Sequence, residues 1–379
     1  MAWLDIDGHE RELDRWPQGA PGGLLAWDAA DEYLVGQWRA LAPGAGPRLL
    51  LVDDHWGALA VALAPMRPVS WGDSHLGHLA LAANLARCGL PADAVPFVPS
   101  VDIPAGPFDV ALVRLPKALD ALEDTLRRLR PVLREGALVL AGGMIKHTPT
   151  RAWRLLEQCL GPAPTTPGWK KARVGAATFT SPPLGPPVAP PAYAVPGDQL
   201  ELRGAPGVFG GGHLDGGAAL LLRHLPRADE ALTAADLGCG DGILALALAR
   251  RCPRALVLAV DESHRAAACA AANLDRNFPQ PDEAARVTVA VADGLADVAP
   301  GSLDLVLCNP PFHQGHAVSD VAAARLFAQA LAALRPGGRL LVVGNRHLGH
   351  HAKLDRLFGN HELVDGDGRF VVVAATRRD

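Results

Sequence analysis

The four residues Asn309-Pro-Pro-Phe312 could hold an amine and a flat ring at the same time. The Asn309 side-chain oxygen and the Pro310 carbonyl can each accept one N–H of an exocyclic amine on a nucleobase. Such an amine is hard to methylate because its lone pair is delocalised, and holding both hydrogens turns that lone pair toward a methyl donor. The prolines fix the loop, and Phe312 offers a face for base stacking. The alternative is a strand-ending proline turn beside a buried phenylalanine.

A glycine-rich turn and further carboxylates precede this motif. The run Asp236-Leu-Gly238-Cys-Gly240 opens an Ala/Leu-rich stretch, and glycines at such a strand–turn–helix let a ligand approach the backbone. Asp261 ends a second apolar run, where a carboxylate suits two ribose hydroxyls. Asp293 ends a third run and can accept an adenine amino group. Sites for NAD and for S-adenosylmethionine share this pattern, and the alternative is that each aspartate only caps a helix.

These residues need a sheet whose strands end at one edge. Short β-branched or leucine-rich runs alternate with Ala/Leu-rich stretches in both halves of the chain. This alternation predicts an α/β fold with a mostly parallel sheet and helices on both faces. In the second half we expect strands at 232–236, 256–260, 287–291, 303–308 and 339–343. A last apolar run at 370–375 follows an Asp/Gly turn and predicts a closing antiparallel strand.

The two halves of the chain repeat each other. Residues 51–64 match 236–249, 82–85 match 271–274, 108–113 match 303–308, and 129–142 match 334–344. The shared order predicts a duplicated domain. The chemistry is not repeated, because Asp53 and His55 stand where the second half has Gly238 and Gly240, and Arg114 stands at the position of Asn309. The first copy is therefore predicted to be degenerate and to bind no cofactor.

A proline-rich segment separates the copies. Seven prolines lie between Ser181 and Pro196. Proline lacks a backbone donor and has a fixed φ, so the segment is predicted to be an extended linker. The predicted organisation is a first domain at 1–180, a linker at 181–197 and a second domain at 198–379.

Charge is distributed unevenly along the chain. The 379 residues carry a net charge of −4, but residues 1–113 carry −8 and residues 114–173 carry +7. A basic stretch on an acidic chain is typical of a surface that faces phosphates. The candidate RNA-binding residues are Arg127, Arg128, Lys170, Lys171 and Arg173. A solvated helix face is the alternative interpretation.

Other features narrow the class of protein. No apolar run is long enough to span a membrane, and the acidic N-terminus lacks a signal pattern, so a cytoplasmic protein is expected. The six cysteines lack the spacing of a zinc site, and no metal is expected. A histidine group fits a surface beside RNA phosphates better than a metal site; its members are His313, His316, His347, His350 and His351.

These motifs give the chain a family resemblance. The second half resembles the class I S-adenosylmethionine-dependent methyltransferases that carry an Asn-Pro-Pro-Phe/Tyr motif. The whole chain is similar to the bacterial ribosomal RNA guanine-N2 methyltransferases, whose N-terminal domain is a degenerate copy. The similar segments are 207–222, 165–173, 309–316 and 345–348, and the last three look like the large-subunit branch. Gly210 departs from the serine that relatives usually carry.

The resemblance implies two Rossmann-like domains, the first for RNA recognition and the second for catalysis with S-adenosylmethionine. Asn309, Pro310 and Phe312 would be catalytic. The implied cofactor-binding residues are Asp236, Gly238, Gly240, Asp261, Asp293 and Asn309. The expected reaction is methylation of the N2 amine of a specific guanine in 23S ribosomal RNA. Alternatives are a guanine of 16S ribosomal RNA, adenine N6, a protein glutamine, or an RNA-binding protein whose methylating half is vestigial.

Overall fold

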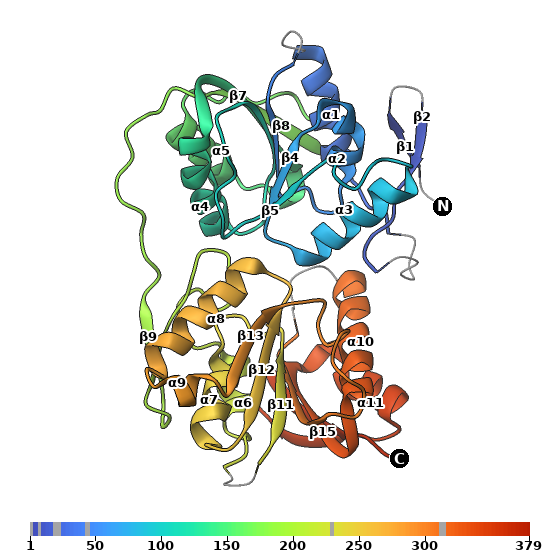
Figure 1. Cartoon of the computed structure of the whole chain (residues 1–379), viewed down its shortest axis with the longest axis vertical. Helices are drawn as coiled ribbons and strands as arrows, with labels where there is room; N and C mark the ends of the chain where they lie inside the picture. Colours follow the sequence, from blue (N-terminus) through green and yellow to red (C-terminus); the bar gives the residue numbers. More distant parts are fainter. Residues whose placement is uncertain (1–2, 7–8, 18–23, 42–45, 228–230, 311–315) are drawn as a thin grey trace. The chain divides into compact units, whose positions relative to one another are not determined.

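The chain forms two compact units. The computed structural model describes residues 3–6, 9–17, 24–41, 46–227, 231–310 and 316–379. The N-terminal unit is Met1–Val188 and the C-terminal unit is Ala189–Asp379 (Figure 1). Within the described ranges, no helix has the length and apolar character needed to cross a membrane.

The N-terminal unit is built on a six-stranded sheet of order β5-β4-β3-β6-β7-β8, counted over the described residues. The strands are β3 (Leu49–Val52), β4 (Val69–Gly72), β5 (Phe97–Pro99), β6 (Phe108–Arg114), β7 (Leu133–Met144) and β8 (Ala172–Thr178). The helices are α1 (Ala29–Leu41), α2 (Ala58–Leu63), α3 (His75–Arg87), α4 (Leu119–Leu129) and α5 (Thr150–Leu160). Helices α1, α2 and α3 pack on one face of the sheet, and α4 and α5 pack on the other. A hairpin of β1 (Trp3–Ile6) and β2 (His9–Glu12) precedes them.

The C-terminal unit has a seven-stranded sheet of order β13-β12-β11-β14-β15-β17-β16 within the described part of the chain. The strands are β11 (Thr233–Leu237), β12 (Leu256–Asp261), β13 (Val287–Val291), β14 (Leu303–Cys308), β15 (Leu334–Asn345), β16 (Glu362–Gly366) and β17 (Phe370–Thr376). The helices are α6 (Gly216–Leu222), α7 (Ile243–Arg251), α8 (His264–Asn277), α9 (Pro281–Ala284), α10 (His316–Ala333) and α11 (His350–Phe358). Helices α6, α7 and α8 cover one face, and α10 and α11 cover the other.

These sheets confirm the predicted fold class. The C-terminal sheet is parallel from β13 to β15, and β17 runs antiparallel to both β15 and β16. The central strands are almost continuously apolar because helices bury both of their faces. The expected strands at 287–291 and 303–308 have the observed bounds. Strand β16 was missed, because its Glu-Leu-Val-Asp-Gly sequence is that of a half-exposed edge strand.

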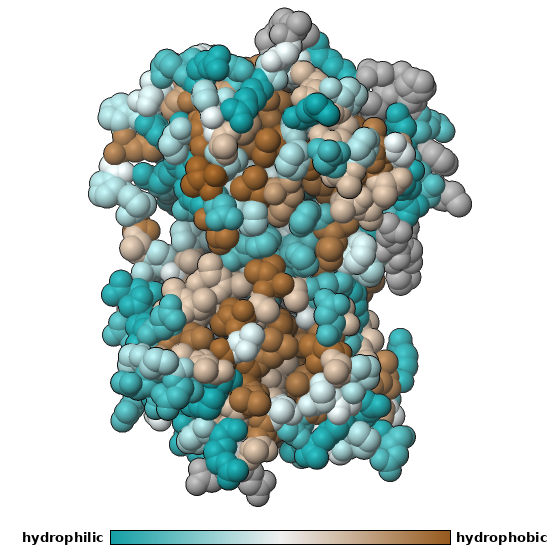
Figure 2. Space-filling view, in the orientation of Figure 1, coloured by the Kyte–Doolittle hydropathy of each residue, from teal (hydrophilic) through white to brown (hydrophobic). Residues whose placement is uncertain are grey.

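The C-terminal unit exposes hydrophobic residues on one part of its surface. On the face drawn in Figure 2, hydrophobic residues of the C-terminal unit gather over the part of the sheet that includes β12 and β13, with hydrophilic residues around them. Leu256, at the start of β12, is among the exposed large hydrophobic residues, with 57% of its area exposed. Strand β13 is the edge strand on this side of the sheet, and most of its residues are only partly buried.

The proline-rich segment has no regular secondary structure from 181 to 191. Its beginning is fastened to the N-terminal unit, since Arg127 donates to the Gly185 carbonyl and Arg130 donates to the Pro182 carbonyl. Its end forms β9 (Ala192–Val195), which pairs with β10 (Leu200–Arg203) in a hairpin of the C-terminal unit. The segment is thus extended and lies outside both large sheets.

Strand register defines the equivalent positions of the two units. Val52 pairs with Val113 in the N-terminal sheet, and Leu237 pairs with Cys308 in the C-terminal sheet. The repeated asparagines also agree: Asn84 donates to the Trp56 carbonyl at 2.8 Å, as Asn273 does to the Asp241 carbonyl at 2.9 Å.

One matched pair in the predicted repeat is wrong. Residues 129–131 end α4 and enter a 3₁₀ turn, whereas residues 334–336 begin β15. The register instead makes Leu133 equivalent to Leu334, because each begins the strand paired with β6 or β14. Leu-Arg occurs at both places in the first copy, and only the sheet register distinguishes them.

Candidate active site

The turn between β11 and α7 leaves space for a ligand at the start of the helix. Gly238, Gly240 and Gly242 have φ values of +80°, +57° and +88°, a backbone conformation that favours glycine. A Cβ atom at Gly238 or Gly240 would meet no heavy atom within 4 Å, so both glycines border open space. A Cβ atom at Gly242 would lie 3.1 Å from the Ala270 Cβ, so this third glycine serves packing against α8.

Asp261 ends β12 beside this turn. Its Oδ2 accepts from the Gly240 amide at 3.0 Å, and its Oδ1 accepts from the Ser263 amide at 2.9 Å. The two bonds fix the direction of the carboxylate at the mouth of the glycine turn. An ionised carboxylate has about four acceptor positions, so these two bonds are compatible with further donors such as ribose hydroxyls.

Asp236 has a different place from the one predicted. Its side chain is fully buried, and its Oδ2 accepts from the Ala245 amide of α7 at 3.0 Å. Burial raises the pKa of Asp236 to about 7. The structure therefore assigns Asp236 to joining β11 with α7 beneath the glycine turn, rather than to direct contact with a cofactor.

This raised pKa predicts a pH-dependent stability. Because the folded protein holds the Asp236 proton more tightly than the unfolded chain, this contribution is complete below about pH 4 and is lost as pH rises through about 7. The variant Asp236→Asn has no proton to lose there. The free energy of unfolding of the wild type should therefore fall relative to that of the variant when the pH is raised from 5 to 8. The difference between the two proteins should change by about 2–3 kcal/mol in favour of the variant. Urea titrations at both pH values measure this change, and a constant difference would contradict it.

Asp293, the third predicted carboxylate, forms an ion pair with Arg325 of α10. Gln329, one helical turn later, accepts from the Leu295 amide at 3.2 Å and donates to the Asp293 carbonyl at 3.0 Å. Helix α10 therefore holds the loop that follows β13. The sequence analysis missed this pair, although their spacing of four residues places both on one face of a helix. The adenine contact of Asp293 stays a prediction.

Asn309 follows β14 directly, on the strand next to β11. Its half-buried side chain carries an Oδ1 atom that is buried and accepts no hydrogen bond within the described ranges. A buried acceptor without a donor is costly, so such a group indicates a missing ligand. Pro310 is buried beside it, whereas Phe312 lies outside the described residues.

Tyr193 and Asn273, which the sequence did not single out, bind Asp241 within the glycine turn. The Tyr193 hydroxyl of β9 donates to the Asp241 carboxylate, whose pKa burial raises to about 6. Asn273 of α8 donates to the Asp241 carbonyl and forms two bonds with the backbone of Arg203 in β10. The β9–β10 hairpin is therefore tied to the turn. The repeated Ala-Ala-Asn-Leu sequence was the available signal for Asn273.

The N-terminal unit has lost each of these features. Register places Asp53 and His55 at the positions of Gly238 and Gly240, as predicted, and places Gly72 at the position of Asp261. The N-terminal unit thus has an aspartate where the C-terminal unit has a glycine of the turn, and a glycine where the C-terminal unit has the aspartate that ends β12. Asp53 now accepts from the Asp73 amide after β4, at 3.3 Å.

A buried ion-pair cluster fills the equivalent of the Asn309 site. Arg114 is buried, and its guanidinium lies 3.0 Å from Asp28 and 3.0 Å from Asp31. Burial raises the pKa of Asp31 to about 6, and the Arg114 charge opposes that rise. A cation in this place cannot accept an amine N–H.

The five basic residues predicted to bind RNA do not form one surface. Arg127 and Arg128 end α4, near the amino end of β7, and the hairpin of β7 and β8 places the other three at the carboxyl end of β7. Arg127 pairs with Glu123, and Arg128 donates to the carbonyls of residues 100–102. These two arginines therefore bind to other parts of the N-terminal unit.

The remaining three are named the 170–173 cluster: Lys170, Lys171 and Arg173. Lys170 pairs with Glu32 at 2.8 Å and lies over the Trp169 ring, and Lys171 is exposed. The Arg173 Nε is buried and has no hydrogen-bond partner within the described part of the chain. Lys171, and Lys170 beside its pair with Glu32, are the exposed cationic groups of this cluster.

The histidine group is divided as well. His350 is buried, and its ring packs edge-on against Phe327 at 5.5 Å. It therefore does not face RNA. His313 lies outside the described residues, as does the side chain of His316. Over the residues that the structure describes, no group of His, Cys, Asp or Glu side chains could hold a metal ion.

Comparisons with known proteins agree with this geometry. Residues 1–181 match the model of the RLMG N-terminal domain, and residues 199–374 match that of the methyltransferase small domain. The chain is 47% identical over 379 residues to the ribosomal RNA large subunit methyltransferase G of Pseudomonas putida, covering 100% of both proteins. It is 44% identical to the protein of that name from Streptomyces coelicolor, covering 97% of this chain and 98% of the relative.

A solved structure shares the fold of the whole chain. The 16S rRNA N2 G1207 methyltransferase of T. thermophilus, in complex with AdoMet and guanosine, has a TM-score of 0.78 and 23% identity, covering 100% of this chain and 98% of that one. The parallel sheet with its glycine turn, acidic strand end and Asn-Pro motif defines a class I methyltransferase, a class that takes its methyl group from S-adenosylmethionine. The chain belongs to the ribosomal RNA large subunit methyltransferase G family.

Proposed function

We propose that this protein methylates the exocyclic N2 amine of a guanine in 23S ribosomal RNA, with S-adenosylmethionine as the methyl donor. The observation that carries the proposal is the buried Asn309 Oδ1 without a donor, beside the open glycine turn. The names of the curated relatives support the large ribosomal subunit, and the N2 specificity of the T. thermophilus enzyme supports guanine N2. We place the reaction in the cytoplasm, where ribosomal RNA of bacteria is made.

The residues present fit the cofactor. The open side of Gly238 and Gly240 would admit it next to the backbone, and Asp261 would accept from its ribose hydroxyls. Asp293 would lie toward its adenine. When bound, S-adenosylmethionine supplies an electrophilic methyl group on sulfur.

The Asn-Pro motif would act by orientation. Asn309 Oδ1 and the Pro310 carbonyl would accept the two N–H groups of the guanine amine, and Phe312 would stack on the base. Holding both hydrogens would turn the nitrogen lone pair toward the methyl group. The N–C bond would then form as the methyl–sulfur bond breaks, S-adenosylhomocysteine would be the leaving product, and the extra proton on nitrogen would pass to solvent. Because the residues act mainly by positioning, no strong base is needed.

We further propose that the N-terminal unit recognises RNA through the 170–173 cluster. A single nucleotide pocket is too small to select one guanine in a long RNA, and this unit has no usable cofactor turn. Trp169 is 39% exposed beside Lys170, and aromatic and basic side chains together suit unpaired nucleotides. Arg127 and Arg128 are left out of this proposal because the fold already uses them.

Neutralising the cluster should weaken RNA binding. Log affinity falls as log salt rises, and each phosphate contact makes this fall steeper. In the variant Lys170→Gln/Lys171→Gln/Arg173→Gln, each lost phosphate contact should therefore reduce the magnitude of the slope by about 0.7–0.9. Cofactor affinity should not change. Filter binding of a 23S RNA transcript over a salt series measures the slope. Arg67→Gln, an exposed arginine at the other end of the sheet, is the matched control. An unchanged slope in the triple variant would contradict the proposal.

The proposed activity is tested with purified protein and labelled S-adenosylmethionine. The expected result is label on 23S RNA transcripts, recovered as N2-methylguanosine after digestion to nucleosides. Label on 16S RNA, on adenine N6 or on protein would replace the proposal with one of those alternatives. Binding of cofactor and RNA without any transfer would favour an RNA-binding protein with a vestigial catalytic half.

A further inference from the structure

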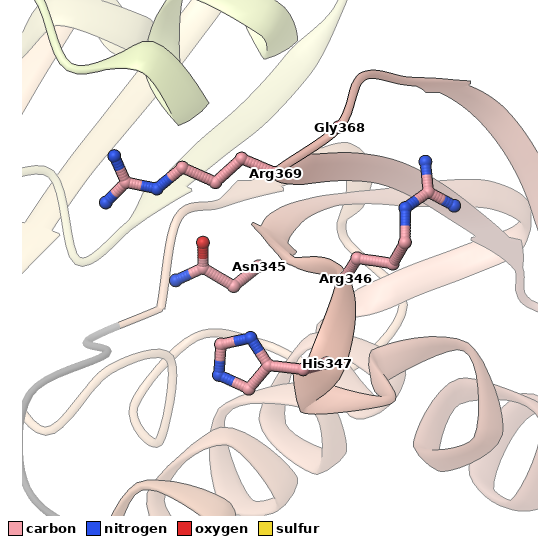
Figure 3. A pocket seen from close by; sticks show the side chains of 5 residues that line it. All are labelled: Asn345, Arg346, His347, Gly368 and Arg369. Atoms are coloured by element: carbon pink, nitrogen blue, oxygen red, sulfur yellow. The ribbon is translucent and has the colours of Figure 1, made fainter.

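A recess of about 560 Å³ lies at the carboxyl end of β15 in the C-terminal unit. It is lined by Asn345, Arg346, His347, Gly368 and Arg369. Figure 3 shows Asn345, His347 and Arg369 extending toward the same side, whereas Arg346 turns away from them. The Arg346 guanidinium donates to the Asp367 carbonyl at 2.7 Å, so it braces the turn between β16 and β17.

The residues that line the recess include two arginines and no acid. Arg346 and Arg369 are exposed, and neither forms an ion pair with a carboxylate in the described part of the chain. Asp367, the acid of the same turn, accepts instead from the amides of Arg369 and Phe370 at 2.7 and 2.6 Å. The Arg369 guanidinium lies over the Phe370 ring at 4.8 Å, which limits its directions. Guanidinium groups without an acidic partner suit a phosphate.

The recess lies at the same edge of the sheet as Asn309. Cys308 of β14 pairs with Val342 of β15, and both strands are parallel. Strand geometry then places Asn345 roughly 10 Å from the end of β14. An RNA strand that presented a base to Asn309 would bring a neighbouring phosphate to this recess.

The N-terminal unit keeps a cation at the equivalent position. The Arg346 amide donates to the Arg369 carbonyl at 2.9 Å, and the Ile145 amide donates to the Lys171 carbonyl at 2.9 Å. Lys171 and Arg369 are therefore at equivalent positions, and Arg369 lines the recess of its own unit. The first copy has lost its glycine turn and its amine acceptor.

We propose that the recess binds a backbone phosphate of the substrate RNA, next to the target nucleotide. Arg369 would be the main contact, with His347 and Asn345 as further donors and Arg346 as the residue that positions the turn. The inference rests on the proposed function, because it places the target base at Asn309.

The test compares RNA binding by three variants over a salt series, using a 23S RNA transcript. Arg369→Gln should weaken RNA binding about 3- to 10-fold. It should also reduce the magnitude of the slope of log affinity against log salt by about 0.7–0.9, the amount for one phosphate contact. Arg369→Lys keeps the charge and should retain the wild-type slope. Arg254→Gln, an exposed arginine before β12 at the opposite edge, should change neither quantity. Thermal melting confirms that each variant is folded.

Wild-type affinity and slope for folded Arg369→Gln would overturn the inference. So would a loss of S-adenosylmethionine affinity in that variant, since the recess would then belong to the cofactor. Binding does not require turnover, so these outcomes are separate from the proposed function. The slope difference between the wild type and Arg369→Gln could be found while the wild type forms no N2-methylguanosine. That result would contradict only the proposed reaction.

Discussion

Replacing Asn309 with alanine should lower the rate of methyl transfer to RNA by about 100-fold or more, with little change in cofactor affinity. The buried Oδ1 would accept from the target amine, so its loss removes an interaction that orients the nucleophile. Such an interaction contributes near the transition state rather than to cofactor binding. Single-turnover transfer of labelled methyl groups and calorimetry with S-adenosylmethionine measure the two quantities.

Asn277→Ala is the matched control for this experiment. Asn277 ends α8, away from the carboxyl edge of the sheet, and it bonds the backbone of Glu201. Its loss should leave the transfer rate within a few-fold of the wild type. A transfer rate for Asn309→Ala that is equally close to the wild type would show that the amine is held in another way.

Asp261→Ala should weaken S-adenosylmethionine binding by about 2–3 kcal/mol, or roughly 30- to 150-fold in Kd. The carboxylate is directed by the Gly240 and Ser263 amides toward the place where ribose hydroxyls would lie. Charge-assisted hydrogen bonds to such hydroxyls have this magnitude. Calorimetric titration of the folded variant measures the loss.

Asp53→Ala in the N-terminal unit is the control for Asp261→Ala. Asp53 occupies the position of Gly238 and accepts from the Asp73 amide. That unit has no glycine turn, so cofactor affinity should not change. An unchanged Kd for folded Asp261→Ala, or an equal loss for Asp53→Ala, would contradict the assignment of the cofactor to the C-terminal unit.

Much of the C-terminal site could be predicted from the sequence. Gly238, Gly240, Asp261 and Asn309 each follow or end an apolar run, and the carboxyl ends of parallel strands share one edge. Periodicity and residue type are enough to place such residues together. The sequence therefore predicted the fold and the edge at which the candidate residues meet.

The role of Asp236 could not be predicted in this way. Its direction depends on which face of β11 is covered by α7. The repeat gives no guide, because the equivalent amides of Ala60 and Ala245 donate to different partners: Asp54 caps the first and Asp236 caps the second. These two aspartates are not at equivalent positions. A helix start needs a carboxylate, and more than one position can supply it.

Long-range pairing explains the other differences. Asp28 and Asp31 neutralise Arg114 across more than eighty residues of chain. A sum of charges along the sequence likewise joined Arg127 and Arg128 with the 170–173 cluster, although β7 separates the two groups. Composition along a segment cannot show which cations the fold has already paired.

The N-terminal unit lacks the groups that form the site of the C-terminal unit. The first copy has exchanged the carboxylate of β12 for Gly72 and the glycine of the turn for Asp53, and it has placed Arg114 where Asn309 would accept an amine. It keeps the sheet, the buried asparagine Asn84 and a cation, Lys171, directly before β8. This pattern fits a domain retained for binding.

Mass mapping of modified nucleosides in ribosomal RNA tests the central claim most directly. RNA is compared from cells with the wild-type chain, without it, and with Asn309→Ala in its place. The account predicts one N2-methylguanosine in 23S ribosomal RNA that is present with the wild type and absent from the other two. Identical 23S maps in all three, or a difference confined to 16S RNA or to adenine, would contradict it.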